Sequence, residues 1–183
     1  MQLATNFLGP FVLTGELLDI LRATPGSRIV SLSSTAHKFG RINFKDLNSE
    51  RRYNNMTAYN QSKLADLMFA LELQRRLDAA GEKNTISVSA HPGLADTGLF
   101  QAIPGFRKLI SALVQPPEMG VLPILRAATD PAVHGGEYYG PHSLLETKGY
   151  PGRARMTRTA RNRHTQRRLW QEAERLTGER YSL

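Results

Sequence analysis

The sequence contains no cysteine, which excludes disulfide bonds and thiolate-rich metal sites and permits a reducing cytosol. Long apolar runs are also missing, because no window approaches the roughly 18 apolar residues that a membrane-crossing helix requires. Met1 is not followed by the basic and then apolar segments of a secretory signal. We therefore expect a cytoplasmic protein without a membrane partner, and its stability must come from packing.

Acidic residues are scarce relative to basic ones, with 16 Asp and Glu against 24 Lys and Arg, a formal net charge of +8. The excess gathers near the C-terminus, at Arg153, Arg155, Arg158, Arg161, Arg163, Arg167, Arg168, Arg175 and Arg180. One interpretation is a tail that binds a polyanion such as nucleic acid. The other is a solvated helix face, favoured by an apolar stripe at Leu169, Trp170, Ala173 and Leu176. We expect the second, with no nucleic-acid partner.

The 183 residues fit one ordinary domain. Apolar side chains at helical intervals predict helices over residues 1–23, Ala58–Ala80, Pro116–Ala128 and Thr165–Leu176. Pro10 should interrupt the first of these. No capping residue precedes Met1, whereas Thr24-Pro25-Gly26 is an ordinary stop signal, and this asymmetry suggests that upstream sequence is missing.

Short β-branched runs predict strands at Arg28–Ser33 and Thr85–Ala90, and Glu137–Tyr139 is a candidate third strand. The polar stretch Thr35–Thr57 shows no sustained period and is expected to be a long loop. Strands that alternate with helices predict an α/β protein, a Rossmann-like doubly wound parallel sheet of about three strands with helices on both faces. Ligands of such sheets bind at the C-terminal ends of the strands.

Two polar motifs could serve such a site, one on a helix and one at a strand end. Tyr59 and Lys63 are four residues apart, so they lie on the same face of the second helix. The nearby ammonium favours the phenolate form, which would let Tyr59 exchange a proton with an alcohol or carbonyl. Ser34 follows the first strand and could donate to a substrate oxygen on which charge develops. Each motif alone is weak, because such pairs arise by chance on helix surfaces and a serine at a strand end often bonds nearby backbone.

The order of the motifs is far more specific. Along the chain follow Asn6-Phe7-Leu8-Gly9-Pro10-Phe11, Arg28 to Ser34, Tyr59 to Lys63, and Pro92-Gly93-Leu94-Ala95-Asp96-Thr97. In this order the sequence resembles the second half of the short-chain dehydrogenase/reductase family. The long segment between Ser34 and Tyr59, with Ala36-His37 early and Ser62-Lys63-Leu64-Ala65 late, is most similar to the retinol-dehydrogenase and WW-domain-oxidoreductase branch.

The resemblance implies a catalytic role for each matching polar residue. Tyr59 would be the general acid and base, and Lys63 would bind the nicotinamide ribose and tune Tyr59. Ser34 would orient the substrate. Asn6 would support a water-mediated proton relay.

The resemblance also implies a nicotinamide cofactor, bordered by Pro92, Gly93 and Thr97 and bound by Tyr59 and Lys63. No Gly-x-x-x-Gly-x-Gly turn is present to cradle its pyrophosphate, and no selector of the ribose 2′ position follows one, so NAD and NADP stay equally open. The family's first βαβ units would precede the chain. We hypothesise that Met1 is an internal methionine or that the gene is truncated, and either would expose a sheet edge.

The leading hypothesis is an oxidoreductase that interconverts a small-molecule alcohol and a carbonyl. An apolar segment in the position of the family's substrate lid suggests an apolar substrate, with ordinary core packing as the alternative; it comprises Leu99, Phe100, Ile103, Phe106, Leu109, Ile110 and Leu113. Homodimers and homotetramers are common among relatives. The competing hypothesis is a non-catalytic remnant that serves as a binding or dimerisation module. The histidines show no metal-ligand spacing, so we expect no metal and interpret them as structural or exposed.

Overall fold

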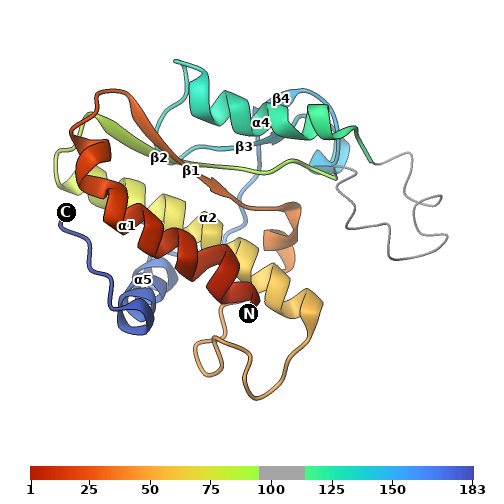
Figure 1. Ribbon diagram of the computed structural model, residues 1–183. Helices are drawn as coiled ribbons and strands as arrows, with labels where there is room; N and C mark the ends of the chain where they lie inside the picture. Colours follow the sequence, from red (N-terminus) through yellow and green to blue (C-terminus); the bar gives the residue numbers. More distant parts are fainter. Residues whose placement is uncertain (95–113) are drawn as a thin grey trace.

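The computed structural model describes residues 1–94 and 114–183 and centres on a 4-stranded sheet (Figure 1). The strands lie in the order β1 (Ser27–Leu32), β2 (Thr85–Ala90), β3 (Tyr138–Pro141) and β4 (Pro151–Arg153). β1, β2 and β3 run parallel, and β4 pairs antiparallel with β3. β1 therefore forms one edge of the described sheet.

The α/β class and the parallel sheet are confirmed, and each of the three predicted strands occurs within two residues of its predicted bounds. The sequence predicted about three strands, and the described sheet has a fourth, β4. This strand has only 3 residues and begins with Pro151, so it carries no alternating pattern that local sequence could reveal. A proline at the start of a short edge strand costs no internal ladder bond, which is why it is tolerated here.

Helices cover both faces of the sheet, as a doubly wound fold requires (Figure 1). On one face lie α1 (Gly9–Arg22), α2 (Asn55–Ala79) and α5 (Arg163–Thr177), and on the other lies α4 (Pro117–Thr129). Within residues 1–94 and 114–183, every helix is too short or too polar to cross a membrane. The expected cytoplasmic location stays a prediction.

The N-terminal helix passes through Pro10 without ending. A π-helical turn, η1 (Ala4–Leu8), precedes α1, and the amide of Gly9 bonds the carbonyl of Ala4 in the wider register of that turn. Pro10 lacks the N–H that would bond the carbonyl of Asn6, so a change of register replaces the predicted interruption. Asn6 consequently lies on the π turn.

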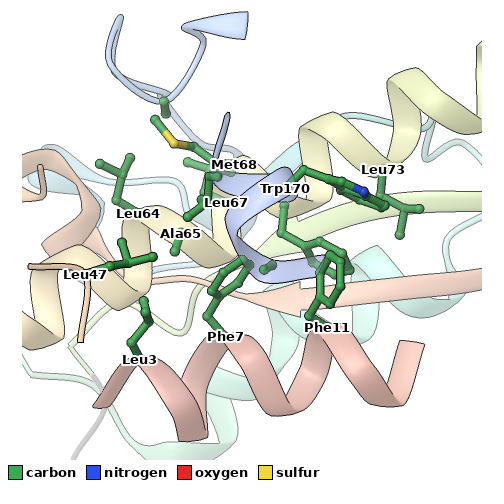
Figure 2. Packing of buried hydrophobic residues seen from close by; sticks show 14 of the residues in the cluster. Leu3, Phe7, Phe11, Leu47, Leu64, Ala65, Leu67, Met68, Leu73 and Trp170 are labelled. Carbon is green, nitrogen blue, oxygen red and sulfur yellow. The ribbon is translucent and has the colours of Figure 1, made fainter. Parts of the chain in front are cut away.

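The main core fills the space between α1, α2 and α5 (Figure 2). Phe7 and Phe11 point from the N-terminal helix toward the core, where the Phe11 ring centroid lies 5.6 Å from that of Phe69 and 5.0 Å from that of Trp170. Tyr181, near the C-terminus, donates a hydrogen bond to the Phe11 carbonyl at 2.5 Å. Aromatic packing thus joins the two ends of the chain.

The arginine-rich C-terminal helix is anchored in this core. Leu169, Trp170 and Ala173 of α5 are buried, as the predicted apolar stripe requires. The guanidinium of Arg76 lies 4.2 Å from the Trp170 ring centroid, a cation–π contact that covers the buried indole. Packing against the core therefore accounts for the apolar face of α5.

Candidate active site

Ser34 lies just beyond β1 and caps a short 3₁₀ turn, η2 (Thr35–Phe39). Its Oγ accepts a hydrogen bond from the Ala36 amide at 3.2 Å, and its carbonyl oxygen is 2.7 Å from His37 Nδ1. A hydroxyl that accepts one bond still has its own hydrogen to donate. The capping role of Ser34 is therefore compatible with donation to a substrate oxygen.

Lys63 reaches from α2 to the C-terminal end of β1. Its Nζ donates to the Leu32 carbonyl at 2.9 Å and to Asp66 Oδ2 at 3.0 Å, and it lies 6.0 Å from the centroid of the half-buried Tyr59 ring. An ammonium has three N–H donors, so these two bonds leave one for a ligand. The structure thus places a fixed positive charge beside the Tyr59 phenol, as their spacing predicts.

Asn6 contacts the same helix from the π turn. Its Nδ2 donates to Ser62 Oγ at 2.9 Å and to Gln2 Oε1 at 3.1 Å, and Ser62 Oγ donates to the Tyr59 carbonyl at 2.8 Å. The two amide hydrogens of Asn6 are occupied by these contacts, so its side-chain oxygen is the atom that can still accept a hydrogen bond. Asn6 is therefore linked to Tyr59 through one shared neighbour.

A serine that sequence reasoning did not single out ties the strand to the helix. Ser33 is buried, and its Oγ donates to the Lys63 carbonyl at 2.7 Å. Together with the bond from Lys63 to Leu32, this contact holds the end of β1 against the first turns of α2. The structure thus brings Asn6, Ser34, Tyr59 and Lys63 to the same end of the sheet.

Asp66 is the second residue that sequence reasoning missed. Its side chain is buried, and burial raises the pKa of its carboxyl from the ordinary 3.8 to about 7, against the opposing effect of the Lys63 ammonium. Its position three residues after Lys63, on the same helix face, was the signal that could have found it.

Pro92 and Gly93 follow β2 at the same end of the sheet. Gly93 has φ +69°, and a Cβ there would lie 2.4 Å from the Thr147 carbonyl oxygen, so only glycine fits without a shift. The Leu94 amide donates to that carbonyl at 2.8 Å. Thr97 and the apolar segment 99–113 lie outside the described residues.

Two of the histidines are buried beside the site, and both contact the ring of one tyrosine. The Tyr138 ring centroid lies 5.4 Å from that of His37 and 5.1 Å from that of His91. Burial lowers the pKa of His37, against the opposing bond to the Ser34 carbonyl. The other three histidines, His134, His142 and His164, are exposed. Among the described residues, no three His, Cys, Asp or Glu side chains gather as metal ligands would.

Known proteins of similar sequence were found, although no family model matches the chain. Polyprenol dehydrogenase of Mus musculus is 39% identical over 188 residues, which cover 97% of this chain and 53% of that protein. Retinol dehydrogenase 14 of Mus musculus is 41% identical over 149 residues, which cover 76% of this chain and 44% of that protein. Retinol dehydrogenase 13 of Homo sapiens is 39% identical over 191 residues, covering 97% and 54%.

Solved structures of similar fold were also found. The crystal structure of an uncharacterized protein from Mycobacterium paratuberculosis matches with a TM-score of 0.80 and 36% identity over 99% of this chain and 60% of that one. The complex of RhlG with NADP from Pseudomonas aeruginosa matches with a TM-score of 0.50 and 22% identity. The match covers 73% of this chain and 52% of that one, and it shows a likeness of fold alone.

The parallel sheet, the order of the motifs and these similarities define a short-chain dehydrogenase/reductase, and the chain belongs to that family. Within the family it is similar to the retinol and polyprenol dehydrogenases. The chain spans about half the length of the curated relatives it matches.

Proposed function

We propose that residues 1–183 form the C-terminal, catalytic part of one Rossmann-fold domain, in an NAD(P)-dependent oxidoreductase that interconverts an alcohol and a carbonyl. The observation that carries this proposal is the position of Lys63. Its ammonium is fixed by the Leu32 carbonyl and the Asp66 carboxylate and lies 6.0 Å from the centroid of the Tyr59 ring. The family's proton-transfer pair therefore has the positive charge that it needs.

Each residue has a defined part in the proposed reaction. Tyr59 gives or takes the proton at its hydroxyl oxygen, with the Lys63 ammonium 6.0 Å from the centroid of its ring. Ser34 donates its hydroxyl hydrogen to the substrate oxygen and stabilises the charge that develops there. Asn6 holds a relay water through its side-chain oxygen. A bound nicotinamide supplies or accepts the hydride.

The described residues fit the nicotinamide end of such a cofactor. Gly93, with φ +69°, lets the backbone after β2 turn tightly against Thr147 at the C-terminal end of the sheet, where ligands of such folds bind. The remaining N–H of Lys63 suits a ribose hydroxyl. Pro92 and Thr97 are proposed to border the ring from the same loop, by analogy with the family. NAD and NADP are both consistent with these residues.

An apolar alcohol or its carbonyl form is the proposed substrate. Two relatives are named for retinol and for polyprenol, both of them apolar alcohols. The segment 99–113 supplies apolar residues at the position of the family's lid. A homodimer or homotetramer is the proposed assembly, by analogy with the family.

Cofactor titration and turnover test this proposal together. The protein is expressed from the full reading frame that contains residues 1–183, titrated with NADH and NADPH by fluorescence, and assayed with retinaldehyde, a polyprenal and a short polar aldehyde. Binding in the micromolar range with faster turnover of the apolar aldehydes supports the proposal. Failure of both cofactors to bind favours the remnant hypothesis.

One observation favours a binding or dimerisation module as the second candidate. Leu13, Leu17 and Ile20 form a stripe on α1 whose side chains are 61%, 45% and 65% exposed, and β1 is an edge strand of the described sheet. Exposed apolar stripes of this kind mark interaction surfaces. Sedimentation velocity of the wild type and of Leu17→Glu would show whether self-association depends on this stripe.

Nucleic-acid binding by the C-terminal arginines makes a separate prediction. Phosphate contacts release counterions, so such binding weakens steeply as salt is raised. A mobility-shift assay at low and physiological salt distinguishes this function, and undetectable or salt-insensitive DNA binding would remove it.

A further inference from the structure

The side chain of Glu146 lies between the two loops that flank the candidate active site. Its Oε2 accepts a hydrogen bond from Lys38 Nζ at 2.8 Å and lies 3.6 Å from His91 Nε2. Lys38 belongs to the η2 turn that begins after Ser34, and His91 directly precedes Pro92 and Gly93. One carboxylate, with a side chain only 12% exposed, therefore contacts both loops.

His91 carries this contact to the backbone of Gly93. The Gly93 amide donates to His91 Nδ1 at 3.2 Å, so the hydrogen of the neutral imidazole must sit on Nε2. Nε2 is buried, has no partner at hydrogen-bond distance, and faces the Glu146 carboxylate. The carboxylate therefore favours the tautomer that keeps Nδ1 free to accept the Gly93 amide.

A parallel connection leads from Lys38 to the serine. His37, its neighbour in η2, has Nδ1 2.7 Å from the Ser34 carbonyl, which can only accept, so this nitrogen donates. The His37 ring packs on Tyr138, and Tyr138 packs on His91. The Ser34 turn and the Gly93 loop thus share a buried cluster of three rings in edge-to-face and tilted contact, with the Glu146 carboxylate beside it.

The backbone of the segment that carries Glu146 is unusual. Leu145 and Glu146 have φ of 66° and 57°, in the left-handed region that side chains rarely adopt. Such conformations persist where surrounding contacts hold them. Here the Arg155 amide donates to Glu146 Oε1 at 2.8 Å, and the adjacent Thr147 carbonyl accepts from Leu94.

The charge of Glu146 is strongly favoured. Burial by itself raises the pKa of its carboxyl, but the contacts with His91, Lys38 and the Arg155 amide outweigh burial and lower the pKa to about 2. The carboxylate is therefore an anion throughout the neutral range.

We propose that Glu146 is a positioning residue that holds the Ser34 turn and the Gly93 loop at a fixed separation. The Ser34 hydroxyl, which would orient the substrate, then keeps its position relative to the Gly93 backbone, which would border the nicotinamide. The effect on catalysis rests on the proposed function, whereas the structural effect on the two loops does not. Glu146 touches neither substrate nor cofactor in this proposal; it acts through Lys38 and His91.

Glu146→Gln tests the proposal because it keeps the shape of the side chain and removes its charge. Glu82→Gln is the matched control. Glu82 forms an ion pair with Arg22 at 2.9 Å, and their side chains are 9% and 32% exposed. The ion pair of Glu146 with Lys38 is similar, at 2.8 Å with side chains 12% and 30% exposed. Both variants and Lys38→Met are made in the protein from the full reading frame. Hydrogen exchange of a peptide spanning residues 91–94 and steady-state kinetics are measured on each.

We expect about tenfold faster exchange of that peptide in Glu146→Gln and Lys38→Met, with exchange of the α2 core unchanged. We also expect kcat to fall by about 10- to 100-fold at a nearly unchanged KM for the substrate, because misplaced reacting groups lower the rate more than binding. Glu82→Gln should leave both measurements within about twofold of wild type.

The outcomes separate this inference from the proposed function. If the wild type shows no oxidoreductase activity but the 91–94 peptide exchanges faster in Glu146→Gln and Lys38→Met and not in Glu82→Gln, the positioning role of Glu146 stands and the proposed function fails. If the wild type is active and neither the exchange of the 91–94 peptide nor kcat changes in Glu146→Gln and Lys38→Met, the proposed positioning role of Glu146 is wrong. A uniform drop in protection across all peptides would show a general stability effect and also overturn it.

Discussion

The Lys63 ammonium and the buried Asp66 carboxylate are 3.0 Å apart on consecutive turns of α2. The same ammonium bonds the Leu32 carbonyl, so Asp66 helps to fix the cation that stands beside Tyr59. Burial raises the pKa of Asp66 to about 7 in spite of Lys63. The burial of Asp66 therefore makes stability depend on pH in a definite direction.

Asp66→Asn should flatten the dependence of stability on pH between about 4 and 7. The folded state binds more protons at Asp66 than the unfolded state does in that range, because the pKa rises from 3.8 to about 7 on folding. Stability from this group is therefore fully present below about pH 4 and is lost as pH rises through about 7, by roughly 1.4 kcal/mol per unit of pKa difference as an upper bound. Urea unfolding from pH 4 to 8 measures the slope.

Asp46→Asn provides a control of opposite sign. Burial opposes ionisation of Asp46, but hydrogen bonds from the amides of Arg51, Glu50 and Arg52 outweigh it and lower the pKa of its carboxyl. Its contribution is lost only as pH falls toward that lowered value, so this variant should change the acidic end of the curve alone. Identical curves for Asp66→Asn and wild type would show that Asp66 is not buried as described.

Tyr59→Phe should lower kcat by about 10²- to 10⁴-fold, the usual contribution of a general acid or base. Cofactor affinity should change little, because the phenyl ring and Lys63 remain. Tyr53→Phe is the control, since Tyr53 is 59% exposed and donates only to Asn55 among the described contacts. Stopped-flow and steady-state rates with an apolar aldehyde check both variants, and a Tyr59→Phe enzyme of wild-type rate would exclude Tyr59 as the acid.

Gly93→Ala should destabilise the protein more than Gly81→Ala. Both glycines have positive φ, +69° and +72°, so each alanine incurs about 1–2 kcal/mol for a left-handed conformation. Only at position 93 does a Cβ meet backbone, the Thr147 oxygen at 2.4 Å, which adds about 1–3 kcal/mol of overpacking. Urea unfolding of both variants measures the difference in their free energies of unfolding. Equal losses of stability would contradict the close approach of Gly93 to the Thr147 carbonyl.

Phe11→Ala should lower the free energy of unfolding by about 3–5 kcal/mol, the usual cost of removing a buried aromatic ring. Phe11 is fully buried, and its ring lies within 5.0 Å of Trp170 and 4.8 Å of Tyr181 by centroid. Leu13→Ala on the same helix should cost far less, because Leu13 is 61% exposed. Thermal and urea unfolding of both variants test this expectation. Similar losses of unfolding free energy in Phe11→Ala and Leu13→Ala would show that Phe11 is not part of the core.

The sequence determined those features that depend on neighbours along the chain. Helical spacing predicted α2 and α5, β-branched runs predicted β1 and β2, and the residue order placed Ser34, Tyr59 and Lys63 at one end of a parallel sheet. Such predictions succeed because a face of a helix or strand is set by local periodicity. The same reasoning found the buried stripe of α5 beneath its arginines.

Only the tertiary structure decided which groups from distant segments meet. β4 is too short to carry a pattern, the register change at Pro10 has no local signature, and Glu146 contacts Lys38 and His91 from far along the chain. These contacts depend on how loops after separate strands pack together. Loop packing is set by steric and charge contacts between distant segments, and the spacing of apolar residues along the sequence does not reveal it. For that reason the sequence identified the candidate reacting groups, whereas the fold identified the residues that contact them from distant segments.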